Sequence, residues 1–215
     1  MITHRKRILV FSIIAALVFL FWSFPALNEG LTKLFISSQT FIELHPILGI
    51  FVFLALAALS AIFVFFSSIV IVPVAVFVWG EVLTFFLLLL GWFIGGLIAY
   101  GLGKHFGRKI AEYFISAGKI DSCGDLFSKK LGIFDVVLLK LALPSEIPSF
   151  FLGIVRYPFL KYLLVLVLSE LPFALWAVYL SGAFVAQDRV FFIVALIVGF
   201  AFLSVVARIL RARSG

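Results

Sequence analysis

The segment from Lys140 to Pro158 places charges, prolines and a glycine inside one of the apolar stretches of a very hydrophobic chain. Hydrocarbon cannot satisfy the backbone groups that proline frees, so such a backbone persists in a membrane only where protein or water surrounds it. Each charge at that depth costs about 2.5–3.5 kcal/mol. We therefore expect a functional site here. Its charges are Lys140, Glu146 and Arg156, and the residues that shape its backbone are Pro144, Pro148, Gly153 and Pro158.

The composition predicts an all-α polytopic membrane protein with a single membrane domain over residues 1–215. The chain is 65% hydrophobic and 13% charged, whereas soluble domains average about 45–50% apolar and about 25% charged residues. The net charge of +7 arises from residues that flank the apolar runs, where membrane topology requires them. We therefore expect membrane lipids, and no nucleic acid, as partners.

Residues for metal, cofactor or enzyme chemistry do not form a recognisable set. Cys123 is the only cysteine, and the three histidines, His4, His45 and His105, share no ligand spacing. A nucleophile with a neighbouring base, or a phosphate-binding loop, is also not evident in the sequence. The sequence therefore predicts no metal, no cofactor and no enzymatic activity.

Apolar runs and flanking charges predict the membrane topology. Full spans are expected at residues 8–24, 82–102, 162–180 and 190–207, the third interrupted by Glu170 and Pro172. The positive-inside rule places both termini and the basic loop 104–130 in the cytoplasm.

Blocks 47–79 and 132–155 must then each begin and end on one side, which gives about four spans plus two opposed re-entrant hairpins. The first block, which contains Ser67-Ser68 and Pro73, can also be read as one full span and a return. The mixed stretch 25–46 suits a short interfacial helix, and a compact chain suits a prokaryotic inner membrane.

Five small residues recur every fourth position in the second apolar run. They lie on one helix face, where small side chains let another backbone approach closely. We expect this face to pack against a helix of the same chain or of a second copy in a homo-oligomer. The five residues are Gly91, Gly95, Ala99, Gly103 and Gly107.

The prolines of the segment from Lys140 to Pro158 predict a bend at residues 145–147, with Glu146 at the tip of the second hairpin. Lys140 would lie about 9 Å down the entering arm and could reach back to Glu146. A Lys140–Glu146 or Arg156–Glu146 pair that only holds the hairpin is the structural alternative. Because ionisable groups are expensive to keep in a membrane, we favour a functional role.

Two further acids could join this site if the two hairpins meet at mid-membrane. Glu81 follows the first block and Glu170 precedes Pro172, so both could line a hydrated cleft of the kind that broken helices form. Glu81 suits an interfacial position beside Trp79 equally well. Arg156 either snorkels to the surface or binds a headgroup phosphate.

Two patterns carry a family resemblance over residues 45–185. The first is Gly-x10-Gly-x3-Gly-Gly-x2-Ala-Tyr-Gly-x-Gly-x3-Gly-Arg from Gly80, and the second is Lys-Leu-x2-Pro-Ser-Glu-Ile-Pro-Ser-x3-Gly-x2-Arg-x-Pro-Phe-x-Lys-Tyr from Lys140. The chain resembles the VTT domain of the DedA superfamily, also called SNARE-associated Golgi proteins, outside the strict DedA branch. It has Lys140 where many relatives have arginine, and Glu170 where glycine is common.

The resemblance implies movement of phospholipids or polyisoprenyl-phosphate carriers between leaflets, through a groove between the two hairpins. A proton- or ion-coupled solute transporter that uses Glu81, Glu146 or Glu170 is an alternative. A non-catalytic membrane organiser that assembles through the glycine face is another.

Overall fold

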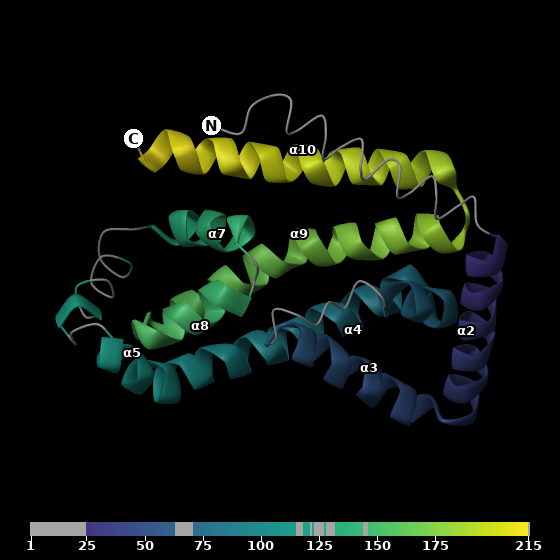
Figure 1. The fold of residues 1–215 in the computed structure, drawn as a ribbon, viewed down its shortest axis with the longest axis horizontal. Helices are drawn as coiled ribbons and strands as arrows, with labels where there is room; N and C mark the ends of the chain where they lie inside the picture. The colour runs from purple at the N-terminus through teal and green to yellow at the C-terminus, as the bar shows by residue number, and fades with distance from the viewer. Residues whose placement is uncertain are drawn as a thin grey trace.

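The fold is a bundle of helices, which the computed structural model describes over residues 25–62, 71–114, 118–120, 122, 127, 132–143 and 146–214. Three long helices run side by side: α4 (Val72–Leu102), α9 (Phe159–Val185) and α10 (Arg189–Ser214) (Figure 1). Segments Val72–Gly107, Phe159–Val185 and Arg189–Leu210 are each long and apolar enough to cross a membrane. The all-α prediction is confirmed for the described residues, and the expected span 8–24 lies outside them.

Two helices precede the long ones. Helix α2 (Pro25–Leu44) runs across the end of the bundle, and α3 (Pro46–Ser60) then turns back along α4 (Figure 1). Pro46 begins α3, because proline lacks only an N–H that the first helical turn leaves unpaired in any case. With 15 residues, α3 is about 22 Å long.

Helix α4 is broken at Gly80, whose φ of 76° and ψ of 173° are open to glycine but strained for other residues. The short arm 72–79 lies along α3, where the Phe53 and Trp79 rings meet edge to face at 5.6 Å. The long arm 81–102 then continues the bundle. Pro73 therefore begins a helix rather than bending one, and Ser67-Ser68 lie outside the described residues.

The basic segment 104–130 begins as a helix. Helix α4 continues through a π-helix (Gly103–Gly107) into α5 (Arg108–Phe114). Arg108 donates to Glu112 at 2.8 Å, and such i,i+4 pairs support a polar helix.

Block 132–155 contains two short helices, α7 (Ile133–Ala142) and α8 (Glu146–Ile154). Leu143 is extended, so the break begins before residue 144 and Glu146 already starts α8. The predicted bend at residues 145–147 was therefore placed slightly too late. Pro148 fits as the third residue of α8, because the first helical turn tolerates proline.

Helix α9 runs through Glu170 and Pro172 without a break, so the predicted interruption is wrong. Membrane helices tolerate proline where neighbouring helices or small backbone adjustments satisfy the freed groups. Four residues beyond Pro172, the Trp176 indole N–H donates to the Ala195 carbonyl at 2.8 Å and holds α10 against α9. Apart from this contact, most of the apolar part of α10 is not buried within the chain.

The small residues of α4 contact two different partners. A Cβ added at Gly91 or Gly95 would overlap atoms of α3, and one added at Gly103 or Gly107 would press on α8. Ala99 is also buried. The predicted packing face therefore exists, but α3 takes its first half and α8 its second half.

We predict that Gly95→Ala destabilises the fold whereas Gly101→Ala does not. The new methyl at position 95 would strike the Ala58 carbonyl, while position 101 on the same helix is open. Overpacking should cost about 1–3 kcal/mol, and alanine at an open helical site should gain up to about 1 kcal/mol. Thermal unfolding of the detergent-purified variants measures both changes, and equal midpoints would contradict the packing.

Candidate functional site

A buried ion pair between Lys140 and Glu170 is the main polar feature of the described bundle interior. The Lys140 ammonium donates to Glu170 Oε1, and the two residues are only 1% and 4% exposed. Lys140 comes from α7 and Glu170 from α9. These two helices pack directly against each other, so the pair joins segments that are 30 residues apart in sequence.

The pair lies near the middle of α9. Glu170 is about 17 Å from the first residue of the helix and about 22 Å from the last, at 1.5 Å per residue. An ion pair at such a site costs desolvation on both sides, and two well-packed apolar side chains would often be as stable. Stability therefore does not explain why the chain keeps these charges.

Aromatic hydroxyl groups extend the polar site toward α4 and α8. Tyr162 is fully buried on α9, and its O–H donates to the Gly96 carbonyl at 2.7 Å. The Ser149 hydroxyl of α8 is a further hydrogen-bond partner of Tyr162, and the Glu170 carboxylate interacts electrostatically with the Tyr162 phenol. The Tyr100 ring stacks on Tyr162 with centroids 4.4 Å apart.

We call Lys140, Glu170, Tyr162, Ser149 and Tyr100 the central polar cluster. Its members come from α4, α7, α8 and α9, so the four helices must keep their relative positions to satisfy it. The Tyr100 O–H donates to the Tyr157 carbonyl at 2.6 Å, which ties the cluster to the turn between α8 and α9. The cluster offers one ammonium and one carboxylate, surrounded by groups that can donate or accept hydrogen bonds.

The structure changes the expected partner of Lys140. Sequence reasoning favoured Glu146, but the carboxylate that Lys140 contacts belongs to Glu170. Helix α7 ends at Ala142 and Glu146 begins a new helix, while α9 passes α7 at the level of Glu170. The side chain of Glu146 lies outside the described part of the chain.

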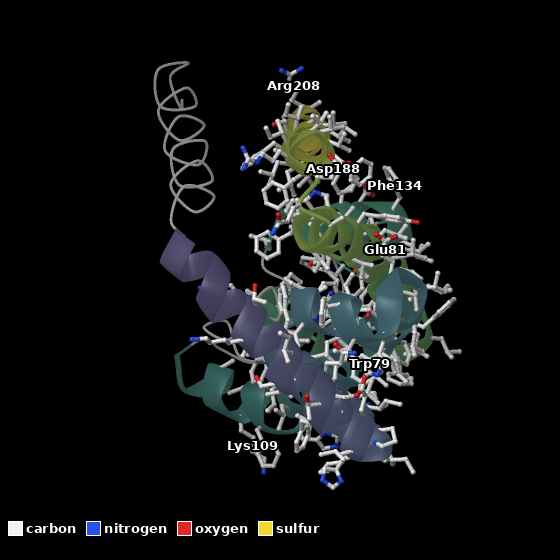
Figure 2. The ribbon with its side chains drawn as sticks, turned by 90° about the vertical axis from the view of Figure 1, so that its right-hand side faces the viewer. Trp79, Glu81, Lys109, Phe134, Asp188 and Arg208 are labelled. Atoms are coloured by element: carbon white, nitrogen blue, oxygen red, sulfur yellow. The ribbon has the colours of Figure 1, made fainter. Side chains whose placement is uncertain are left out.

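The predicted neighbourhood of Glu81 and Glu170 is not formed. The Glu81 carboxylate lies against Gly182 of α9, in the space that a Cβ there would fill (Figure 2). Gly182 is 12 residues beyond Glu170, or about 18 Å along the helix. Glu81 is partly exposed and follows Trp79 by two residues, which agrees with the interfacial alternative.

The remaining predicted residues lie around the turn from α8 to α9. Arg156 is exposed and has a φ of 55°, and Pro158 is the N-cap residue of α9. Gly153 packs so closely on α4 that an added Cβ would overlap the Tyr100 carbonyl. Pro144 lies outside the described residues.

Sequence reasoning missed Tyr162, Ser149 and Thr84. Tyr162 lies eight residues before Glu170, a spacing that puts both near one helix face, so it could have been found. Thr84 is fully buried, and its hydroxyl is without a partner among the described residues. Its usual acceptor would be the carbonyl of Gly80, where the helix is broken.

Comparison with known proteins gives one family match. The family model of the VTT domain matches residues 65–183, which is just over half of the chain. No curated protein and no solved structure matches the chain. The matched range contains the long arm of α4, the short helices α7 and α8, and nearly all of α9.

We predict that breaking the ion pair destabilises the fold more than removing it. Lys140→Met leaves Glu170 buried without its cation and should cost about 3–5 kcal/mol, or less if the carboxyl takes up a proton. The double variant Lys140→Met with Glu170→Leu should recover most of that loss. Thermal unfolding of the two single variants and the double variant gives the coupling. Additive losses would show that the two charges act independently.

Proposed function

Because the chain belongs to the VTT-domain family, we propose that it moves a lipid with a phosphate headgroup between the leaflets of a membrane. A phospholipid or a polyisoprenyl phosphate fits this description. The observation that carries the proposal is the Lys140–Glu170 pair near the middle of α9. A charged headgroup that crosses hydrocarbon needs a partner of opposite charge on its way, because charge is most expensive at that depth.

Exchange of partners at Lys140 is the proposed mechanism. When a lipid phosphate arrives, its oxygens accept hydrogen bonds from the Lys140 ammonium in place of Glu170. Glu170 then turns to the hydroxyl groups of the central polar cluster. When the phosphate leaves, Glu170 returns to Lys140 and the site is neutral again. Between passages Glu170 pairs with Lys140, so the ammonium always has an anionic partner.

The short helices support the two re-entrant hairpins of this proposal. A helix must be about 30 Å long to cross the hydrocarbon. By their residue counts, α3 is about 22 Å long, α7 about 15 Å and α8 about 14 Å. Helices of this length are shorter than the hydrocarbon is thick, which supports the proposal that each block returns to the side from which it entered.

The lipid path in this proposal runs past the α4–α9 pair. Helix α3 packs on α4 and α7 packs on α9, so these two long helices lie between the hairpins. The basic end of the bundle, where α4 ends and α9 begins, would face the cytoplasm together with both termini. A prokaryotic inner membrane is the proposed location.

A proton-coupled solute transporter is the second candidate, and the buried Glu170 carboxylate favours it. A carboxylate that alternates between Lys140 and a proton can link proton entry to movement of a substrate. The two candidates differ in their energy source. Lipid exchange through a groove needs no gradient, whereas coupled uptake does.

The first test is lipid exchange in liposomes that contain the purified protein. We expect wild-type protein to speed transbilayer exchange of a labelled phospholipid. Lys140→Gln should slow it about tenfold or more, since removing one side of a buried charge pair costs at least 1.4 kcal/mol. Lys140→Arg should retain most of the activity because it keeps the cation. Lys33→Gln, at an exposed lysine of α2, is the matched control.

Three outcomes would redirect the proposal. Equal exchange rates for Lys140→Gln, Glu146→Ala and wild type would show that Lys140 and Glu146 have no role in lipid exchange. Uptake of a solute that requires a pH gradient, without lipid exchange, would favour the transporter. A stable homo-oligomer in detergent, with no effect of the charge variants on function, would favour a membrane organiser.

A further inference from the structure

The turn between α8 and α9 holds an arginine in a backbone conformation that favours glycine. Arg156 has a φ of 55°, in the left-handed region. Its N–H donates to the Gly153 carbonyl at 3.0 Å, and the Tyr157 N–H donates to the Leu152 carbonyl at 2.9 Å. This hydrogen-bond pattern ends a helix with one left-handed residue, a position that glycine usually fills.

The other end of α9 repeats the same turn with an uncharged residue. Gln187 has a φ of 54°, and its N–H donates to the Phe184 carbonyl at 3.2 Å. The Asp188 N–H donates to the Ala183 carbonyl at 3.0 Å, as in the first turn. The backbone therefore accepts an uncharged side chain in this turn. The fold does not require a positive charge there.

The surroundings of Arg156 combine cations with exposed apolar side chains. Helix α8 packs on the π-helix so closely that a Cβ added at Gly153 would lie 2.8 Å from the backbone nitrogen of Lys104. Arg156, Lys104 and Lys161 are all exposed at this end of the bundle. Phe106 of the π-helix is 63% exposed, and Leu160 at the start of α9 is 76% exposed. We call these five residues the Arg156 surface.

We propose that the Arg156 surface binds the phosphate headgroup of an anionic membrane lipid, and that Arg156 makes the direct contact. The partner follows from charge complementarity, because guanidinium and phosphate form paired hydrogen bonds and basic residues at a membrane surface attract anionic lipids. Exposed Phe106 and Leu160 suit the acyl boundary below the headgroups. Glu112 of the neighbouring α5 does not compete, since it accepts from Arg108 at 2.8 Å.

This site is separate from the central polar cluster, and it does not require that the lipid crosses the membrane. Arg156 is exposed, whereas the Lys140–Glu170 pair is enclosed. A headgroup held at Arg156 is concentrated at one end of α9. If lipids do cross, this surface is where an anionic lipid would be selected before it enters.

The test compares lipid binding by variants of the two matching turns in the full chain. Detergent-purified protein is titrated with phosphatidylglycerol or with phosphatidylcholine of the same acyl chains, and the rise in thermal unfolding midpoint gives the apparent affinity. Arg156→Gln introduces the side chain that the matching turn already carries at position 187, so it should fold. Arg156→Lys keeps the charge. Gln187→Gly is the control for the turn itself.

We expect Arg156→Gln to weaken phosphatidylglycerol binding about fivefold, the effect of one basic residue at a membrane surface. Arg156→Lys should lose much less, and Gln187→Gly should bind like wild type. Phosphatidylcholine should affect all four proteins equally. Unchanged phosphatidylglycerol binding in Arg156→Gln, or an equal loss in Gln187→Gly, would overturn the proposal. Inorganic phosphate that stabilises wild type as well as the lipid does would overturn the lipid assignment.

Discussion

The buried pair of Lys140 and Glu170 constrains the whole bundle interior. Each of these charges is tolerable only while the other is in place, because an unpaired ion at a dry site costs several kcal/mol. The helices that supply them, α7 and α9, therefore cannot slide past each other by even one turn. The hydroxyl groups of Tyr162 and Ser149 add the same requirement for α8 and α4. The short helix α7 is held by this ion pair in addition to the apolar side chains that it buries in the bundle.

Close backbone approach does the rest of the positioning. Helix α4 carries glycine at its contacts with α3, α9 and α8, so three neighbours reach its backbone directly. The Tyr162 hydroxyl can reach the Gly96 carbonyl because neither residue is held away by a bulky neighbour. Between helices in lipid the hydrophobic effect gives little attraction, so such close packing and interhelical hydrogen bonds must supply it. The aromatic stack of Tyr100 and Tyr162 lies where these contacts meet.

Much of the helix layout could be predicted from the sequence, because apolar run length and proline position act locally. The long arm of α4, helix α9 and helix α10 follow from their hydrophobic runs. Gly80 already separated the short arm of α4 from its long arm. The partner of Lys140 could not be predicted in this way. Periodicity says which face of a helix carries Glu170, but not which neighbour packs there. Lys140 and Glu170 are 30 positions apart in sequence and lie on different helices, so no local pattern links them.

The 30 residues between Lys140 and Glu170 also affect how the protein is made. A chain enters the membrane from its N-terminus onward, so the lysine leaves the ribosome before its carboxylate does. Until α9 is complete, Lys140 lacks the Glu170 carboxylate and cannot settle at depth without a cost of about 2.5–3.5 kcal/mol. We therefore expect α7 and α8 to stay at the membrane surface until α9 is made, and to enter the membrane together with it. Assembly of this region is a late, cooperative step, and its timing is set by the order of two charges along the chain.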